Sequence, residues 1–123
     1  MKKKIIGICL CLSLLLCGCS ATEEEKKQAL NIAETLGVTM ILSETSMREH
    51  IGDEYKFKYN KSIPEDALEY AMDNINIDYK KNALSTVMEY ENGKIYKEEE
   101  IRNILMEQGY SDADIKFVLD KLN

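Results

Sequence analysis

The sequence is poor in the residues that enzyme and metal sites most often need. Its 123 residues include no tryptophan, one proline and one histidine, His50. All four cysteines lie within the first 19 residues, so the rest of the chain cannot form an internal disulfide or a cysteine metal site. A zinc site of the usual type needs about four nitrogen, sulfur or oxygen ligands. We therefore expect no metal, no small-molecule substrate and no enzymatic activity, and we assign His50 a structural place at the end of a short helix.

The charge is unevenly distributed. Lysine and arginine number 16 and aspartate and glutamate 22, for a net charge of −6. Residues 1–19 carry three lysines and no acid, which leaves 13 basic against 22 acidic residues, a net charge of −9, in the remainder. An acidic surface repels the phosphates of nucleic acids, so we expect no nucleic-acid partner.

The first residues have the pattern of an export signal. Three lysines precede the apolar run from Ile5 to Cys17, whose 13 residues are fewer than the roughly 20 that span a bilayer. Leu16 and Gly18 before Cys19 resemble the lipobox of bacterial lipoproteins. The resemblance implies that the signal peptide, residues 1–18, is removed and that Cys19 receives a covalent diacylglyceryl lipid, with no other cofactor. An uncleaved N-terminal anchor helix is the alternative.

The remaining sequence has helical periodicity and divides into two similar parts. Apolar residues recur at intervals of three and four, which favours α-helices throughout. Residues 28–51 align with 82–105 without a gap, and residues 63–75 align with 110–122. The sequence thus predicts an all-α fold after a lipidated tether, residues 19–27. The predicted fold consists of a first three-helix repeat, residues 28–77, with an insertion near 52–61, and a second three-helix repeat, residues 78–123. The repeats are helix-turn-helix-like and are expected to pack as one compact body, because a unit of about 45 residues is near the lower limit for folding alone.

Helix boundaries have recognisable signals. Ser43, Ser46, Ser62 and Ser111 are candidate N-caps, and Thr22 has the capping-box spacing to Glu25. Gly109 stands where a helix end favours positive φ, and the dipeptide at 92–93, Asn-Gly, indicates a turn.

A short aromatic segment inside the insertion is the candidate partner-binding site. Aromatic residues and lysines alternate there, and no acid occurs from Tyr55 to Pro64. Alternation at period two predicts an extended strap with three rings on one side. The rings either cover the body as core or are exposed as anchors for a partner. The candidate residues are Tyr55, Lys56, Phe57, Lys58 and Tyr59.

The repeat resembles that of the Ltp-like host-cell-surface-exposed lipoproteins. The second repeat carries the similarity through Asn82-Ala-Leu84, Tyr90, Tyr96, Ile101, Leu105, Gly109-Tyr-Ser111, Phe117-Val-Leu-Asp120 and Leu122. The first carries it through Gln28-Ala-Leu30, Ala33-Glu34, Leu42-Ser43 and the run Tyr70 to Ile75. Lys97, Glu100, His50, Ile104 and the 52–61 insertion depart from the pattern.

The resemblance implies a prophage-encoded lipoprotein on the extracytoplasmic face of the cell membrane. Such proteins block DNA injection by superinfecting phages and act on the phage tape-measure protein. The alternative is a structural or adaptor lipoprotein that binds a wall or membrane protein of the host. In both cases the partner is a protein, and the membrane is reached through the lipid on Cys19.

Overall fold

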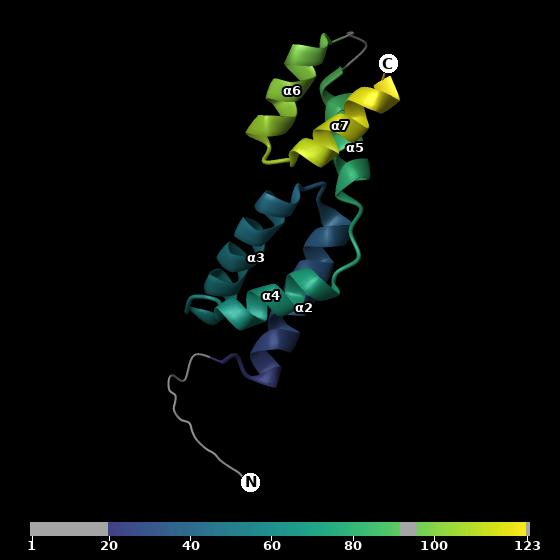
Figure 1. Ribbon diagram of the computed structural model, residues 1–123. Helices are drawn as coiled ribbons and strands as arrows, with labels where there is room; N and C mark the ends of the chain where they lie inside the picture. The colour runs from purple at the N-terminus through teal and green to yellow at the C-terminus, as the bar shows by residue number, and fades with distance from the viewer. Residues whose placement is uncertain (1–19, 92–95, 123) are drawn as a thin grey trace.

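The chain folds into α-helices joined by short turns (Figure 1). The computed structural model describes residues 20–91 and 96–122, and this part of the chain contains no β-strand. The helices are α2 (Glu23–Thr39), α3 (Glu44–Tyr59), α4 (Glu65–Asn74), α5 (Tyr79–Glu91), α6 (Glu98–Glu107) and α7 (Asp112–Leu122). The all-α class predicted from the periodicity is confirmed. Residues 23–27, expected in the tether, belong to α2.

Most of the predicted helix starts are capped as expected. The Thr22 hydroxyl accepts a hydrogen bond from the Glu25 amide at 3.0 Å, while the Glu25 carboxylate accepts one from the Thr22 amide at 2.8 Å. Ser43 caps α3 through the Ser46 amide at 3.1 Å. Ser46 and Ser62 are the exceptions: Ser46 lies inside α3, and α4 begins at Glu65 after Pro64 and has no side-chain cap. The Asn-Gly turn signal at 92–93 lies outside the described residues.

The helices form two units of three, each with its own apolar core. In the first unit α2 packs against α3 and α4, and in the second α7 packs against α5 and α6. The first core consists of Ala29, Ile32, Ala33, Leu36, Leu42, Met47, Ile51, Tyr55, Ala67 and Ala71. The second consists of Ala83, Val87, Ile101, Leu105, Tyr110, Ile115, Val118 and Leu119. The expected compact body is thus made of two separately packed halves in contact.

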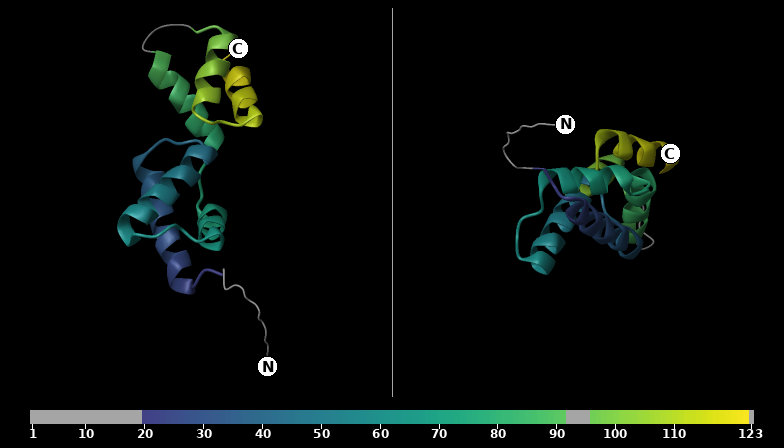
Figure 2. Two further views of the ribbon diagram at one scale, coloured as in Figure 1. Left: turned by 90° about the vertical axis from the view of Figure 1, so that its left-hand side faces the viewer. Right: turned by 90° about the horizontal axis from the view of Figure 1, so that it is seen from below.

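The two units are stacked along one axis (Figures 1 and 2). The segment from Ile75 to Asp78 connects them, between the end of α4 and the start of α5. α2 begins at the end of the first unit that lies farthest from the second unit. The part of the chain nearest the predicted lipid site is therefore at one end of the stack, and α6 and α7 are at the other.

The predicted insertion is helical. α3 has 16 residues and its counterpart α6 has 10, so most of the extra residues of the first unit lengthen this helix. The expected short second helix and extended strap are therefore wrong for residues 55–59. His50 consequently lies within α3 and not at its end, where its Nδ1 donates to the Ser46 carbonyl at 2.8 Å.

Candidate interaction surfaces

The aromatic segment forms the last turn of α3, and one of its rings, that of Tyr55, faces the core. Met47, Ile51 and Tyr55 follow one another at intervals of four residues, which places them on one helix face, and all three are fully buried. The Tyr55 ring lies 4.8 Å from that of Tyr59, and its hydroxyl donates to the Gln28 side chain at 3.2 Å. Burial raises the pKa of the Tyr55 phenol. Tyr55 is therefore a structural residue of the first core.

The other residues of this turn point away from the core. The Phe57 side chain is 84% exposed, which is unusual for so large an apolar group, and both flanking lysines, Lys56 and Lys58, are exposed. Tyr59 is partly exposed at 38%. Of the five predicted partner-binding residues, only Tyr55 is buried, and the structure leaves Phe57, the two lysines and part of Tyr59 available to another molecule.

An ion pair attaches the turn after α3 to the start of α2. The Lys61 ammonium lies 2.5 Å from the Glu25 carboxylate, the same group that closes the Thr22 capping box. The hydrogen bond from Lys61 lowers the pKa of the Glu25 carboxyl, and the bond from the Thr22 amide lowers it further. The exposed end of α3 is thereby held beside the first turn of α2.

Hydrogen bonds join the two units where α3 begins and α6 ends. The Ser43 hydroxyl donates to the Gln108 carbonyl at 2.7 Å, and the Ser46 hydroxyl reaches the same oxygen at 3.2 Å. Close by, the Asn82 amide donates to the Leu42 carbonyl at 2.9 Å. The junction is therefore polar, in contrast to the apolar cores on either side.

A glycine is required at this junction for two reasons. Gly109 follows α6 with φ +85°, a conformation that side chains with a Cβ rarely adopt. The Gly109 and Tyr110 amides donate to the Met106 and Leu105 carbonyls, both at 3.0 Å, which is the Schellman pattern of helix ends. A Cβ at Gly109 would lie 3.1 Å from the Ser43 hydroxyl and from Thr45.

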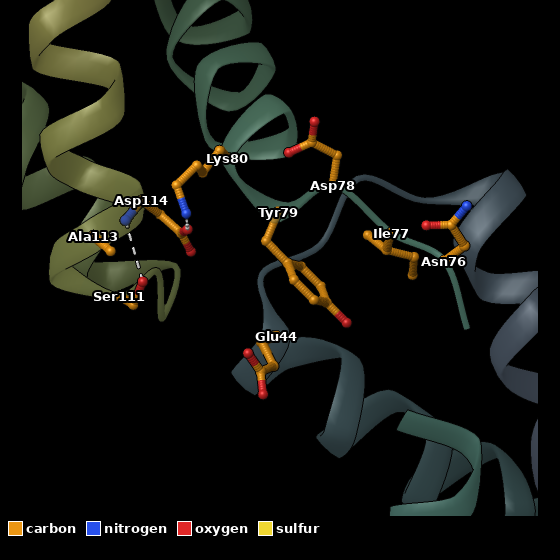
Figure 3. A pocket seen from close by; sticks show the side chains of 9 residues that line it. All are labelled: Glu44, Asn76, Ile77, Asp78, Tyr79, Lys80, Ser111, Ala113 and Asp114. Atoms are coloured by element: carbon orange, nitrogen blue, oxygen red, sulfur yellow. Dashed lines mark hydrogen bonds and ion pairs between the residues drawn. The ribbon is translucent and has the colours of Figure 1, made fainter. Parts of the chain in front are cut away.

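A cleft opens beside the junction, between the start of α3 and the starts of α5 and α7 (Figure 3). It has a volume of about 560 Å³, and Tyr79 projects into it opposite Glu44. Asp114 is 7% exposed, and its carboxylate lies 3.8 Å from the Lys80 ammonium. Burial raises the pKa of the Tyr79 phenol. The lining residues are Glu44, Asn76, Ile77, Asp78, Tyr79, Lys80, Ser111, Ala113 and Asp114.

Three further expectations from the sequence concern the lipid attachment residue, metal binding and the membrane. Cys19, the predicted lipid attachment residue, lies outside the described residues. Within residues 20–91 and 96–122 no group of three or more histidine, cysteine or carboxylate side chains is arranged to hold a metal ion. No helix of that same part of the chain is long and apolar enough to cross a membrane.

Local sequence patterns do not indicate the junction, although its residues stand out for other reasons. Ser43 is a predicted cap, Asn82 belongs to a repeat motif and Gly109 marks a predicted helix end. Their contacts join residues as far as 65 positions apart, so no local pattern indicates them. One sequence feature does link these residues: Ser43, Asn82 and Gly109 all belong to the motifs that carry the family resemblance.

Two three-helix units in tandem, joined by a four-residue connection and a polar junction, define an all-α repeat fold. That fold is shared with a solved structure described as Ltp, a superinfection exclusion protein from the Streptococcus thermophilus temperate phage TP-J34. The two superpose with a TM-score of 0.60 at 22% sequence identity, over 84% of this chain and 100% of the other. No protein-family model matches the sequence, and no curated protein matches it either. The resemblance drawn from the repeat motifs is thus confirmed by the fold.

Proposed function

We propose that this protein is a surface lipoprotein that protects a lysogenic bacterium from superinfecting phages. Lipid on Cys19 anchors it to the outer face of the cell membrane. There it binds a protein of the incoming phage, for which the tape-measure protein is the candidate, and blocks DNA injection. No covalent bond is made or broken in this mechanism, because the protein acts by binding its partner through the faces of its helices.

The likeness of fold to Ltp carries the proposal. It extends over the full length of the Ltp chain and includes both repeats of this protein. The export signal and the lipobox supply the second part of the argument, since they would place the folded part at the surface that phage DNA must cross. Superinfection exclusion is the function given for Ltp, and these two features extend it to this chain.

The short connection to the lipid is part of the mechanism. Cys19 precedes the helix cap Thr22 by three residues, which span at most about 11 Å. The folded part would therefore stay close to the bilayer, where anchoring raises its effective concentration at the site of injection. Two acyl chains make such attachment durable, whereas one chain binds only marginally.

A phage challenge tests the proposal. A sensitive host expressing the full-length protein is infected, and adsorption and DNA injection are scored separately. We expect normal adsorption with blocked injection for at least one phage of a broad panel. Normal injection for every phage of the panel would contradict phage exclusion and favour the alternative, an adaptor lipoprotein of the host envelope. Crosslinking at the membrane surface would then identify the partner.

A second strain tests the anchor. Residues 1–18 are replaced by an ordinary secretory signal and Cys19→Ala is introduced, so that the same folded part is secreted without lipid. At matched amounts we expect weaker protection than from the anchored form, and incorporation of labelled palmitate only into the form with Cys19. Equal protection by both forms would show that the anchor has no part in exclusion.

A further inference from the structure

The last turn of α3 has a surface suited to a lipid bilayer. We propose that this end of the first unit, with Phe57, Lys56 and Lys58, rests on an anionic membrane, so that the protein stands on the cell surface with its second unit outward. This inference rests on the proposed lipid anchor at Cys19. It adds an orientation that the anchor alone does not impose.

The first step is position. The end of α3 lies beside the start of α2, because the Lys61 ammonium is 2.5 Å from the Glu25 carboxylate and the Tyr55 hydroxyl is 3.2 Å from the Gln28 side chain. Thr22, the cap of α2, is three residues from the lipid-bearing position, a span of at most about 11 Å. The end of α3 is thus held on the side of the molecule from which the lipid emerges.

The second step is surface chemistry. Phe57 is 84% exposed, and the turn that carries it is held by the buried ring of Tyr55, against which the Tyr59 ring packs at 4.8 Å. An exposed aromatic ring between lysines is typical of segments that lie in the membrane interface, where the ring enters the headgroup boundary and the cations meet anionic lipids. A ring that is 84% exposed is available for this role.

The third step is charge. No acid occurs from Tyr55 to Pro64, although the chain beyond residue 19 has a net charge of −9. Two exposed acids, Asp53 and Glu54, lie one turn earlier on the same helix, and two of the acids in the first turn of α2 are already compensated. Glu23 pairs with Lys26 at 3.6 Å and Glu25 with Lys61. Lys56 and Lys58 are exposed and form no ion pair with any residue of 20–91 or 96–122, which leaves their charge for lipid headgroups.

The orientation has a consequence for the proposed function. The two units are stacked along one axis with the start of α2 at one end (Figures 1 and 2). If that end rests on the bilayer, the second unit and the junction cleft stand away from the membrane. A protein that approaches the cell from outside would then meet the second unit first.

The absence of tryptophan allows a direct test. Phe57→Trp and, as a control, Met106→Trp on α6 each place a single tryptophan at an exposed apolar position, since Met106 is 62% exposed. The purified lipidated protein is reconstituted into vesicles of phosphatidylcholine with and without phosphatidylglycerol. We expect blue-shifted emission and quenching by brominated lipids for the tryptophan at 57 in the anionic vesicles, and neither effect at 106.

The lysines are tested in the Phe57→Trp background. Lys56→Gln and Lys58→Gln should each weaken docking roughly fivefold, seen as a smaller quenched fraction. Circular dichroism controls for folding, and we expect unchanged helicity because both side chains are exposed. Equal quenching with and without these lysines, or equal quenching in neutral vesicles, would overturn the electrostatic part of the proposal.

Four results would overturn the orientation, each in a distinguishable way. Protein that floats with the vesicles while the tryptophan at 57 stays in water leaves the anchor intact and removes the docking. Quenching at both 57 and 106 would mean that the molecule lies flat. If Phe57→Ala loses phage exclusion while the tryptophan of the separate Phe57→Trp variant stays in water, this surface would be assigned to a protein partner. Protein that does not float at all would overturn the anchor together with the orientation.

Discussion

The Ser43 hydroxyl lies 2.7 Å from the Gln108 carbonyl oxygen, and this hydrogen bond joins the first unit to the second. The same hydroxyl accepts from the Ser46 amide at 3.1 Å and thereby caps α3. The buried Ser43 hydroxyl therefore donates a hydrogen bond between the units and accepts one within the first unit. Each unit has its own apolar core, and such polar contacts join the units together with Tyr79 of α5, which packs against the first core.

Ser43→Ala should lower the free energy of unfolding by about 1–2 kcal/mol, since the helix cap and the bond between the units are lost together. Urea unfolding followed by circular dichroism measures the change. Ser62→Ala is the matched control, because Ser62 is exposed and caps no helix, and should stay within about 0.5 kcal/mol of the wild type. Equal losses in the two variants would show that Ser43 has no special place at the junction.

Gly109→Ala should destabilise the protein by about 1–3 kcal/mol. The positive φ of +85° is strained for alanine, and its Cβ would lie 3.1 Å from the Ser43 hydroxyl and from Thr45. Thermal unfolding provides the measurement. Gly52→Ala serves as the control, because Gly52 lies within α3 and a Cβ there would meet only Ile63 at 3.8 Å. That substitution should stabilise the helix by about 0.5–1 kcal/mol, and destabilisation by both would contradict the backbone argument.

Local patterns predicted the parts of the fold that depend on near neighbours. Apolar intervals of three and four indicated helices, and Thr22 and Ser43 cap them because a side chain can reach an amide three residues away. Gly109 adopts the expected positive φ for a similarly local reason. These features depend on no contact between distant parts of the chain.

The prediction for residues 55–59 was wrong because two periodic patterns overlap in this part of the sequence. Tyr55, Phe57 and Tyr59 alternate with lysines, which is the period of a strand, yet Met47, Ile51 and Tyr55 recur every four residues, which is the period of a helix. The second pattern decided the structure because it buries three large side chains in the first core. Local patterns do not indicate the contacts of the junction, since these join residues 62 and 65 positions apart.

Tyr55 and Phe57 should differ sharply in their effect on stability. Tyr55→Ala removes a fully buried ring and should cost about 3–5 kcal/mol, as a large cavity does in other cores. Phe57→Ala, two residues on, should stay within about 0.5 kcal/mol because its ring is 84% exposed. Helicity and thermal midpoints measure both variants. A large loss of helicity in Phe57→Ala would show that this ring belongs to the core, and would remove the basis for membrane docking.

The Glu25–Lys61 pair predicts a specific dependence of stability on pH. The pKa of Glu25 is lower in the folded protein than in the unfolded chain, mainly through its hydrogen bond from Lys61. Its carboxylate therefore stabilises the fold at pH values above the unfolded pKa of about 4.3, and this contribution is lost as the pH falls through the folded value. Acidification should weaken the first unit by releasing the turn after α3 from the start of α2.

Glu25→Gln isolates the charge in this effect, because glutamine at this position still completes a capping box but cannot form the ion pair. The variant should be less stable than the wild type at neutral pH and equal to it once the pH lies below the folded pKa of Glu25. Urea unfolding at a series of pH values measures the difference. Glu24→Gln is the control in the same turn, since its carboxylate accepts only a longer bond of 3.4 Å from Gln28. A difference between Glu25→Gln and wild type that persisted in acid would mean that the shape of the cap, and not its charge, holds the end of α3 in place.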